Sequence, residues 1–120
     1  MKKKIRICFE YPGFHRWPDA PERRKYLRDL HRHLFKIEVE MEVRDNDREI
    51  EFHDLLDMCK AVTGYGEQFN MECNQDASCE LHAEVLLSNL TSQYCKKINR
   101  YISVTVSEDG ECGATVINEN

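Results

Sequence analysis

The longest regular pattern in the chain is a strict alternation of side-chain types from His31 to Val43. Side chains alternate between the two faces of a β-strand, so every second residue of this segment shares a face. One face is apolar after its first two positions and consists of His31, His33, Phe35, Ile37, Val39, Met41 and Val43. The segment predicts a half-buried strand that opens with two histidines on its apolar face.

Three shorter segments have the same alternation and predict further strands. They are residues 3–10, 101–107 and 114–118. The segment that follows the first of them, residues 11–21, contains three prolines and a glycine. Because proline and glycine interrupt regular structure, this segment is expected to be a loop.

Other segments have the spacing of helices, with apolar residues three and four positions apart. Residues 51–62 predict one helix and Cys79–Tyr94 predict a second, with Ser78 as its N-cap. A short helix is expected at residues 22–30, since Pro21 fits a first helical turn. The polar residues 63–76 are expected to form a loop.

The long elements follow one another in the order ββααββ. The chain of 120 residues contains no repeat and no low-complexity linker, so a single domain over residues 1–120 is expected. This order predicts an α+β fold, with a four-stranded antiparallel sheet and two helices on one of its faces.

Charge is unevenly distributed along the chain. The net charge is −5, but residues 1–36 carry a charge of +7 and residues 37–120 carry −12. A basic first third can attract an anion such as phosphate, although a solvated surface is the first interpretation of such a charge distribution. The overall acidity argues against duplex nucleic acid as the main partner.

Nothing in the chain resembles a membrane span or a signal peptide, because no run of 18 apolar residues occurs. A cytoplasmic location without membrane contact is therefore expected. The six cysteines include no CxxC pair, and in a reducing compartment they are expected to be free thiols.

The two histidines that open the long strand suggest a metal site. His31 and His33 share a face, and His15 follows the first strand. If these two strands pair as a hairpin, His15 comes close to the start of the second strand. Three neutral imidazoles are a common ligand set for zinc with an open fourth position. The alternative is that HxH on a strand arises by chance.

The chain resembles the superfamily of 6-pyruvoyltetrahydropterin synthase and 6-carboxytetrahydropterin synthase. In that family a histidine follows strand one, LHGHxY opens strand two, a DF pair opens the first helix, PTxE opens the second helix and a later strand ends in ET. The corresponding segments here are FHRWP, LHRHLF, EFHDLL, HAEVLL and VSED, in the same order.

The resemblance implies a tunnelling fold, which closes into a barrel by homo-oligomerisation, commonly as a hexamer of two trimers. It implies Zn²⁺ bound by His15, His31 and His33. It also implies that Glu108 anchors the edge of a pterin- or purine-like ring, and that Glu84 matches the glutamate of PTxE. A carboxylate suits such an edge because it accepts two N–H bonds side by side.

The catalytic residues of the family are not evident in this sequence. Its cysteine falls at Leu27, and the glutamate of a variant class falls at Arg28. Its LDHH segment corresponds to GYGEQFN, which contains Glu67. Candidates for proton transfer are therefore Asp29, Glu67 and His82. Arg16 and Arg28 are candidates for holding a phosphate, since arginine forks suit that group.

Two functions follow from these observations. The first is a divergent zinc-dependent carbon–oxygen lyase of the pterin or deazapurine synthase type. The second is a binding protein that retains the metal and Glu108 and sequesters a nucleotide signal without turnover, as some viral counter-defence proteins do. Both recognise a small purine- or pterin-like ligand.

Overall fold

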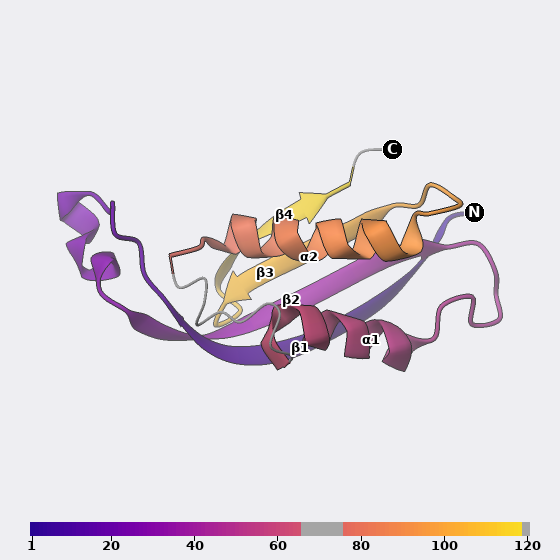
Figure 1. Ribbon diagram of the computed structural model, residues 1–120, viewed down its shortest axis with the longest axis horizontal. Helices are drawn as coiled ribbons and strands as arrows, with labels where there is room; N and C mark the ends of the chain where they lie inside the picture. The colour runs from indigo at the N-terminus through magenta and orange to yellow at the C-terminus, as the bar shows by residue number, and fades with distance from the viewer. Residues whose placement is uncertain (66–75, 119–120) are drawn as a thin grey trace.

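The protein, seen in a computed structural model that describes residues 1–65 and 76–118, is built on one antiparallel sheet. Its strands lie in the order β1-β2-β3-β4, with β1 at Lys3–His15, β2 at His31–Val43, β3 at Ile102–Glu108 and β4 at Cys112–Ile117. Helices α1 (Phe52–Lys60) and α2 (Cys79–Tyr94) cover one face of the sheet (Figure 1). The expected α+β class and four-stranded antiparallel sheet are confirmed.

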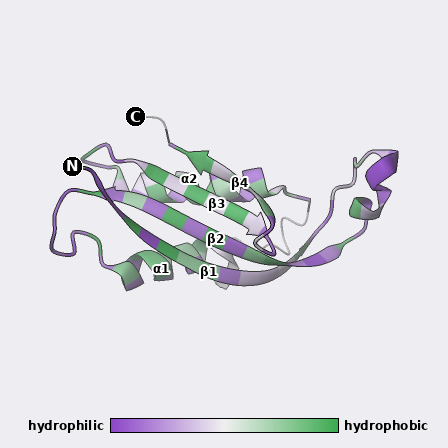
Figure 2. Ribbon diagram, turned by 180° about the vertical axis from the view of Figure 1, so that it is seen from behind, coloured by the Kyte–Doolittle hydropathy of each residue, from purple (hydrophilic) through white to green (hydrophobic). Residues whose placement is uncertain are grey.

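The core lies between the sheet and the two helices. From behind, the strands lie in front of both helices, and hydrophilic and hydrophobic residues alternate along them (Figure 2). The inner face of β2 supplies Phe35, Ile37, Val39, Met41 and Val43, all buried. Helix α2 contributes Ala83, Leu86, Leu87 and Leu90 to the same core. The face predicted from strict alternation is therefore the face that is buried.

Strand β1 is longer than its sequence indicates. Residues 11–15 were expected in a loop, but β1 continues through Pro12 and Gly13 to His15. The expectation was wrong because β1 is an edge strand that pairs only with β2. An edge strand tolerates proline, since half of its N–H groups have no partner strand to bond.

Beyond β3, the β1–β2 pair projects as an arm (residues 12–34). Within it, residues 22–30 were expected to form a helix, but Glu22–Arg28 forms only 3₁₀ turns with a kink at Arg24. No residue of this segment is buried and no side chain caps it. Without tertiary packing, a helix this short is unstable in water. The arm extends away from the helices, at the left of Figure 1.

The boundaries of the remaining elements agree with the pattern to within a few residues. Helix α2 begins and ends as expected, and the Ser78 side chain accepts a hydrogen bond from the Leu81 N–H at 3.1 Å. Helix α1 ends at Lys60 and continues as a π-helical turn at Ala61–Tyr65. None of the helices in the described part of the chain is long and apolar enough to cross a membrane.

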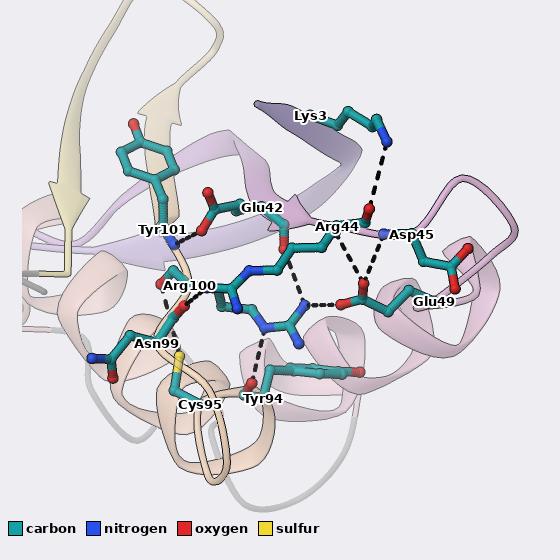
Figure 3. A network of polar contacts seen from close by, with 10 residues as sticks. All are labelled: Lys3, Glu42, Arg44, Asp45, Glu49, Tyr94, Cys95, Asn99, Arg100 and Tyr101. Carbon is teal, nitrogen blue, oxygen red and sulfur yellow. Dashed lines mark hydrogen bonds and ion pairs between the residues drawn. The ribbon is translucent and has the colours of Figure 1, made fainter. Parts of the chain in front are cut away.

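A buried arginine connects the elements at the end of the sheet opposite the arm. The Arg100 guanidinium donates to Glu49 Oε2 at 2.8 Å, to the Glu42 carbonyl at 3.0 Å and to the Tyr94 carbonyl at 3.0 Å (Figure 3). These contacts join the end of β2, the segment before α1 and the end of α2. The network is structural, and it leaves the arm end of the sheet as the place where histidines gather.

Candidate metal centre

Three histidines meet on the inner face of the sheet at the base of the arm. His15 and His31 are directly opposite each other in the β1–β2 register, and His33 lies two residues further along β2. Their ring centroids are 4.5 Å (His15–His31), 5.1 Å (His15–His33) and 4.9 Å (His31–His33) apart. One nitrogen from each ring lies within 4.8 Å of the other two. This group can hold a metal ion.

The lengths of the strands explain why the three histidine side chains are not packed inside the main core. Strand β3 pairs with β2 only from Phe35 onward, so the first residues of β2 pair with β1 alone. The inner face of this two-stranded ribbon is therefore not filled by the main core. Phe35 forms its floor, with its ring centroid 5.2 Å from that of His15 and 5.9 Å from that of His33.

Each histidine also contacts an acceptor on its outer side. His31 Nδ1 lies 2.8 Å from the Asp29 carbonyl oxygen, and His33 Nδ1 lies 2.7 Å from Asp109 Oδ2. His15 makes a hydrogen bond with the backbone of Ala77. Carbonyl and carboxylate oxygens only accept, so His31 and His33 each carry the proton on Nδ1. Metal-binding histidines in proteins are held by outer contacts of this kind.

The inward nitrogens have the properties that a metal requires. His15 Nε2 and His33 Nε2 are buried and have no hydrogen-bond partner among the described residues. Burial lowers the pKa of His15, and the nearby Glu108 carboxylate only partly offsets this effect. A lowered pKa keeps the imidazole neutral, which is the form that binds metals.

Glu108 faces the same nitrogens from the end of β3. Its Oε1 lies 3.1 Å from His15 Nε2 and its Oε2 lies 3.5 Å from His33 Nε2. These are ion-pair distances, but neither nitrogen makes a hydrogen bond to the carboxylate, and both remain without a hydrogen-bond partner among the described residues. A negative carboxylate beside three imidazoles favours a cation between them.

A pocket of about 510 Å³ opens beside the histidines. Its lining includes His15, His31, Glu108, Trp17, Leu27 and Glu80. This volume suits a small-molecule ligand, and the mixture of aromatic, apolar and charged side chains is typical of such sites. Trp17, which lines the pocket from the arm, is half exposed.

The two arginines predicted to bind phosphate lie differently. Arg16 lines the pocket and pairs with Asp76, with Nε 2.6 Å from Oδ1. Arg28 does not line it, because its guanidinium donates to the Ala20 carbonyl at 2.8 Å and pairs with Glu22 at 3.5 Å. The structure therefore brings only Arg16 to the pocket.

The remaining predicted residues are dispersed. The Asp29 side chain is exposed, and only its carbonyl contacts the histidines. Glu84 is exposed on α2 and is not part of the pocket lining. His82 is buried beside Phe35, with ring centroids 6.3 Å apart. Glu67 lies outside the described residues.

Three residues of the site were not predicted from sequence. Glu80 lines the pocket from the first turn of α2, one turn before Glu84. The sequence did contain a signal for Glu80. Ser78 was predicted as the N-cap of this helix, and Glu80 is the glutamate of the first turn after that cap. Asp109 holds His33, and Cys79 Sγ lies 3.9 Å from Glu108 Oε1. Burial raises the pKa of the Cys79 thiol to about 12, so it remains protonated.

Comparisons with known proteins identify the fold but not the function. No protein-family model matches the chain, and no curated protein matches it. Among solved structures, the chain is similar to the crystal structure of an uncharacterized protein, WS1659, from Wolinella succinogenes. The TM-score is 0.71 at 16% sequence identity, over 99% of each chain. At this identity, the likeness shows a shared fold alone.

Proposed function

We propose that the protein is a zinc-binding member of the tunnelling-fold superfamily that recognises a purine- or pterin-like ring. The observation that carries the proposal is the set of three histidines held by outer acceptors, with the buried Nε2 atoms of His15 and His33 facing inward. Nitrogen ligands in this number suit zinc with an open fourth position. When bound, zinc supplies a Lewis acid that polarises a carbonyl or hydroxyl oxygen of the ligand.

Recognition of the ring is assigned to Glu108 and the pocket beside it. The carboxylate lies at the pocket wall and accepts two parallel N–H bonds from an amino-pyrimidine edge. Trp17 supplies a flat surface for the ring, and Arg16 supplies positive charge for an attached phosphate. Each of these three side chains lines the same pocket as His15 and His31.

Binding without turnover is favoured over a lyase reaction. Leu27 lies on the pocket lining, at the position where the resembling family carries its proton-transferring cysteine. A leucine cannot exchange a proton. Asp29 and His82 do not line the pocket, although each was a candidate to replace that cysteine. The lyase remains the second candidate, with Glu67 as its candidate acid–base group.

The partner of the chain is proposed to be further copies of itself. Five large apolar side chains on the arm are exposed: Phe14, Trp17, Tyr26, Leu30 and Leu34. Exposed apolar residues concentrated in this way mark interaction surfaces. A homo-oligomer, a hexamer of two trimers by the family resemblance, covers them and places the pocket next to a neighbouring chain.

Zinc titration against a chelating dye tests the metal assignment. The wild-type chain is expected to bind about one zinc, and His31→Ala is expected to weaken the affinity by more than about 100-fold, the upper range for loss of an outer contact alone. His31 is half buried in the arm and not in the main core, so the variant is expected to fold.

His53→Ala is the matched control, because His53 is an exposed histidine of α1, far from the arm. It is expected to bind zinc like the wild type. A zinc affinity that is equal in the wild type, His31→Ala and His53→Ala would show that the three histidines do not form the site.

A further inference from the structure

Asp109 occupies an unusual place at the end of β3. The regular pairing of β2 with β3 ends at Phe35–Glu108. Beyond this pair, Asp109 forms hydrogen bonds with the backbone of Leu34. The Leu34 N–H donates to Asp109 Oδ1 at 2.9 Å, and the Asp109 N–H donates to the Leu34 carbonyl at 2.8 Å. The second carboxylate oxygen, Oδ2, accepts from His33 Nδ1 at 2.7 Å.

The backbone of Asp109 is in the left-handed region, with a φ of 57°. Aspartate and asparagine adopt this conformation more readily than other side chains except glycine. The conformation turns the chain into the β3–β4 hairpin directly after Glu108. As a result, one residue faces the inner nitrogens of the histidines and the next residue reaches the outer nitrogen of His33.

The two oxygens of Asp109 have different tasks. Oδ1 accepts from the Leu34 N–H, which has no partner in β3 because the β2–β3 pairing ends at Phe35. Oδ2 remains for His33, and because it only accepts, the imidazole must carry its proton on Nδ1. In the neutral imidazole, Nε2 of His33 then carries the lone pair, and it is the buried atom that faces Glu108 and the other histidines.

We propose that Asp109 is the positioning residue of this metal centre: its carboxylate sets the tautomer and the orientation of His33, so that Nε2 is presented to the metal. The inference rests on the proposed metal binding and goes beyond it, since it names the residue on which the geometry of one ligand depends. Removing the outer partner of a metal-bound histidine weakens metal affinity about 10- to 100-fold.

The alternative is that Asp109 only ends the hairpin. Asp109→Asn separates the two roles, because asparagine keeps the shape, tolerates the same φ and still offers Oδ1 to the Leu34 N–H. Its NH₂ group then faces His33 Nδ1. Two donors cannot bond each other, so the proton of His33 is expected to move to Nε2, where it blocks the metal.

Two measurements test the proposal, both on the full chain. The first is zinc affinity by chelator competition for the wild type, Asp109→Asn and the control Glu111→Gln. The second is the ¹⁵N spectrum of the His33 ring in chelator-treated protein, which reports the protonated nitrogen. Glu111→Gln makes the same charge change at an exposed position of the same turn.

Asp109→Asn is expected to weaken zinc binding about 10- to 100-fold and to move the His33 proton to Nε2, whereas Glu111→Gln changes neither. Wild-type zinc affinity in Asp109→Asn, or an unchanged Nδ1 proton, overturns the inference, even if the variant is less stable. A wild-type chain that binds no zinc overturns the proposed function instead, and the spectrum alone then decides whether Asp109 sets the tautomer.

Discussion

One buried side chain beside the candidate metal centre resists taking up a proton. His82, on the inner side of α2, is only 3% exposed, and burial lowers its pKa from 6.5 to about 4, with His15 adding a smaller effect in the same direction. The folded chain therefore resists protonation of His82, while the unfolded chain does not. This difference connects one buried side chain to the stability of the whole protein.

The stability of the chain is expected to fall with pH in a window set by His82. Below pH 6.5 His82 is protonated in the unfolded state but stays neutral in the folded state. The free energy of unfolding therefore decreases as pH falls from 6.5 towards 4. The loss attributable to His82 is up to about 3 kcal/mol, taking 1.36 kcal/mol for each pKa unit. Denaturant unfolding of chelator-treated protein at several pH values measures it.

The comparison that isolates this effect is His82→Leu, which removes the titrating group and keeps an apolar side chain in the core. The variant is expected to lose less stability between pH 6.5 and pH 4 than the wild type, whatever its stability at neutral pH. His53→Leu makes the same change at an exposed site and should follow the wild-type profile. Parallel profiles for His82→Leu and the wild type would show that folding does not lower the pKa of His82.

Strand ends and turns, more than the strands themselves, determine the geometry of the site. Strand β2 was predictable in full because its alternation is strict over its whole length. The end of β1 was not, because the rule that proline and glycine interrupt a strand does not hold at the edge of a sheet. The contact between Asp109 and His33 joins residues 76 positions apart, and no local pattern reports such a pairing.

The β3–β4 hairpin depends on the close approach of two strands at Gly113. A Cβ atom at this position would lie 2.5 Å from the Val106 carbonyl oxygen and 2.6 Å from Ser107 Cβ. Gly113→Ala is therefore expected to destabilise the chain by about 1–3 kcal/mol, the usual cost of inserting a methyl group where there is no space. The midpoint of chemical unfolding measures the loss.

Glu111→Ala is the control for this hairpin, since it changes an exposed residue of the same turn. It is expected to unfold near the wild-type midpoint. If Gly113→Ala unfolded at the wild-type midpoint as well, β3 and β4 would not approach as closely as described.

At the scale of the whole molecule, the chain is elongated, with extents of 50 × 26 × 23 Å. The arm accounts for part of this length and extends past the helices (Figure 1). Strands β1 and β4 leave two open sheet edges, and open edges together with exposed apolar side chains favour association between chains. The order of elements and the class of fold were predictable from sequence, whereas the projection of the arm was not, because it depends on where β3 ends.

The most direct test of the account is native mass spectrometry, with metal analysis, of the protein purified from cells. We predict about one zinc per chain, an oligomer of identical chains, and a retained mass in the range of a pterin or nucleotide. Glu108→Gln is expected to keep the zinc and lose that ligand. The glutamine NH₂ group replaces one carboxylate oxygen, so one N–H of the ring faces a donor in place of an acceptor. A wild-type chain without zinc, including after reconstitution with the metal, would contradict the assignment of His15, His31 and His33 and the function built on it.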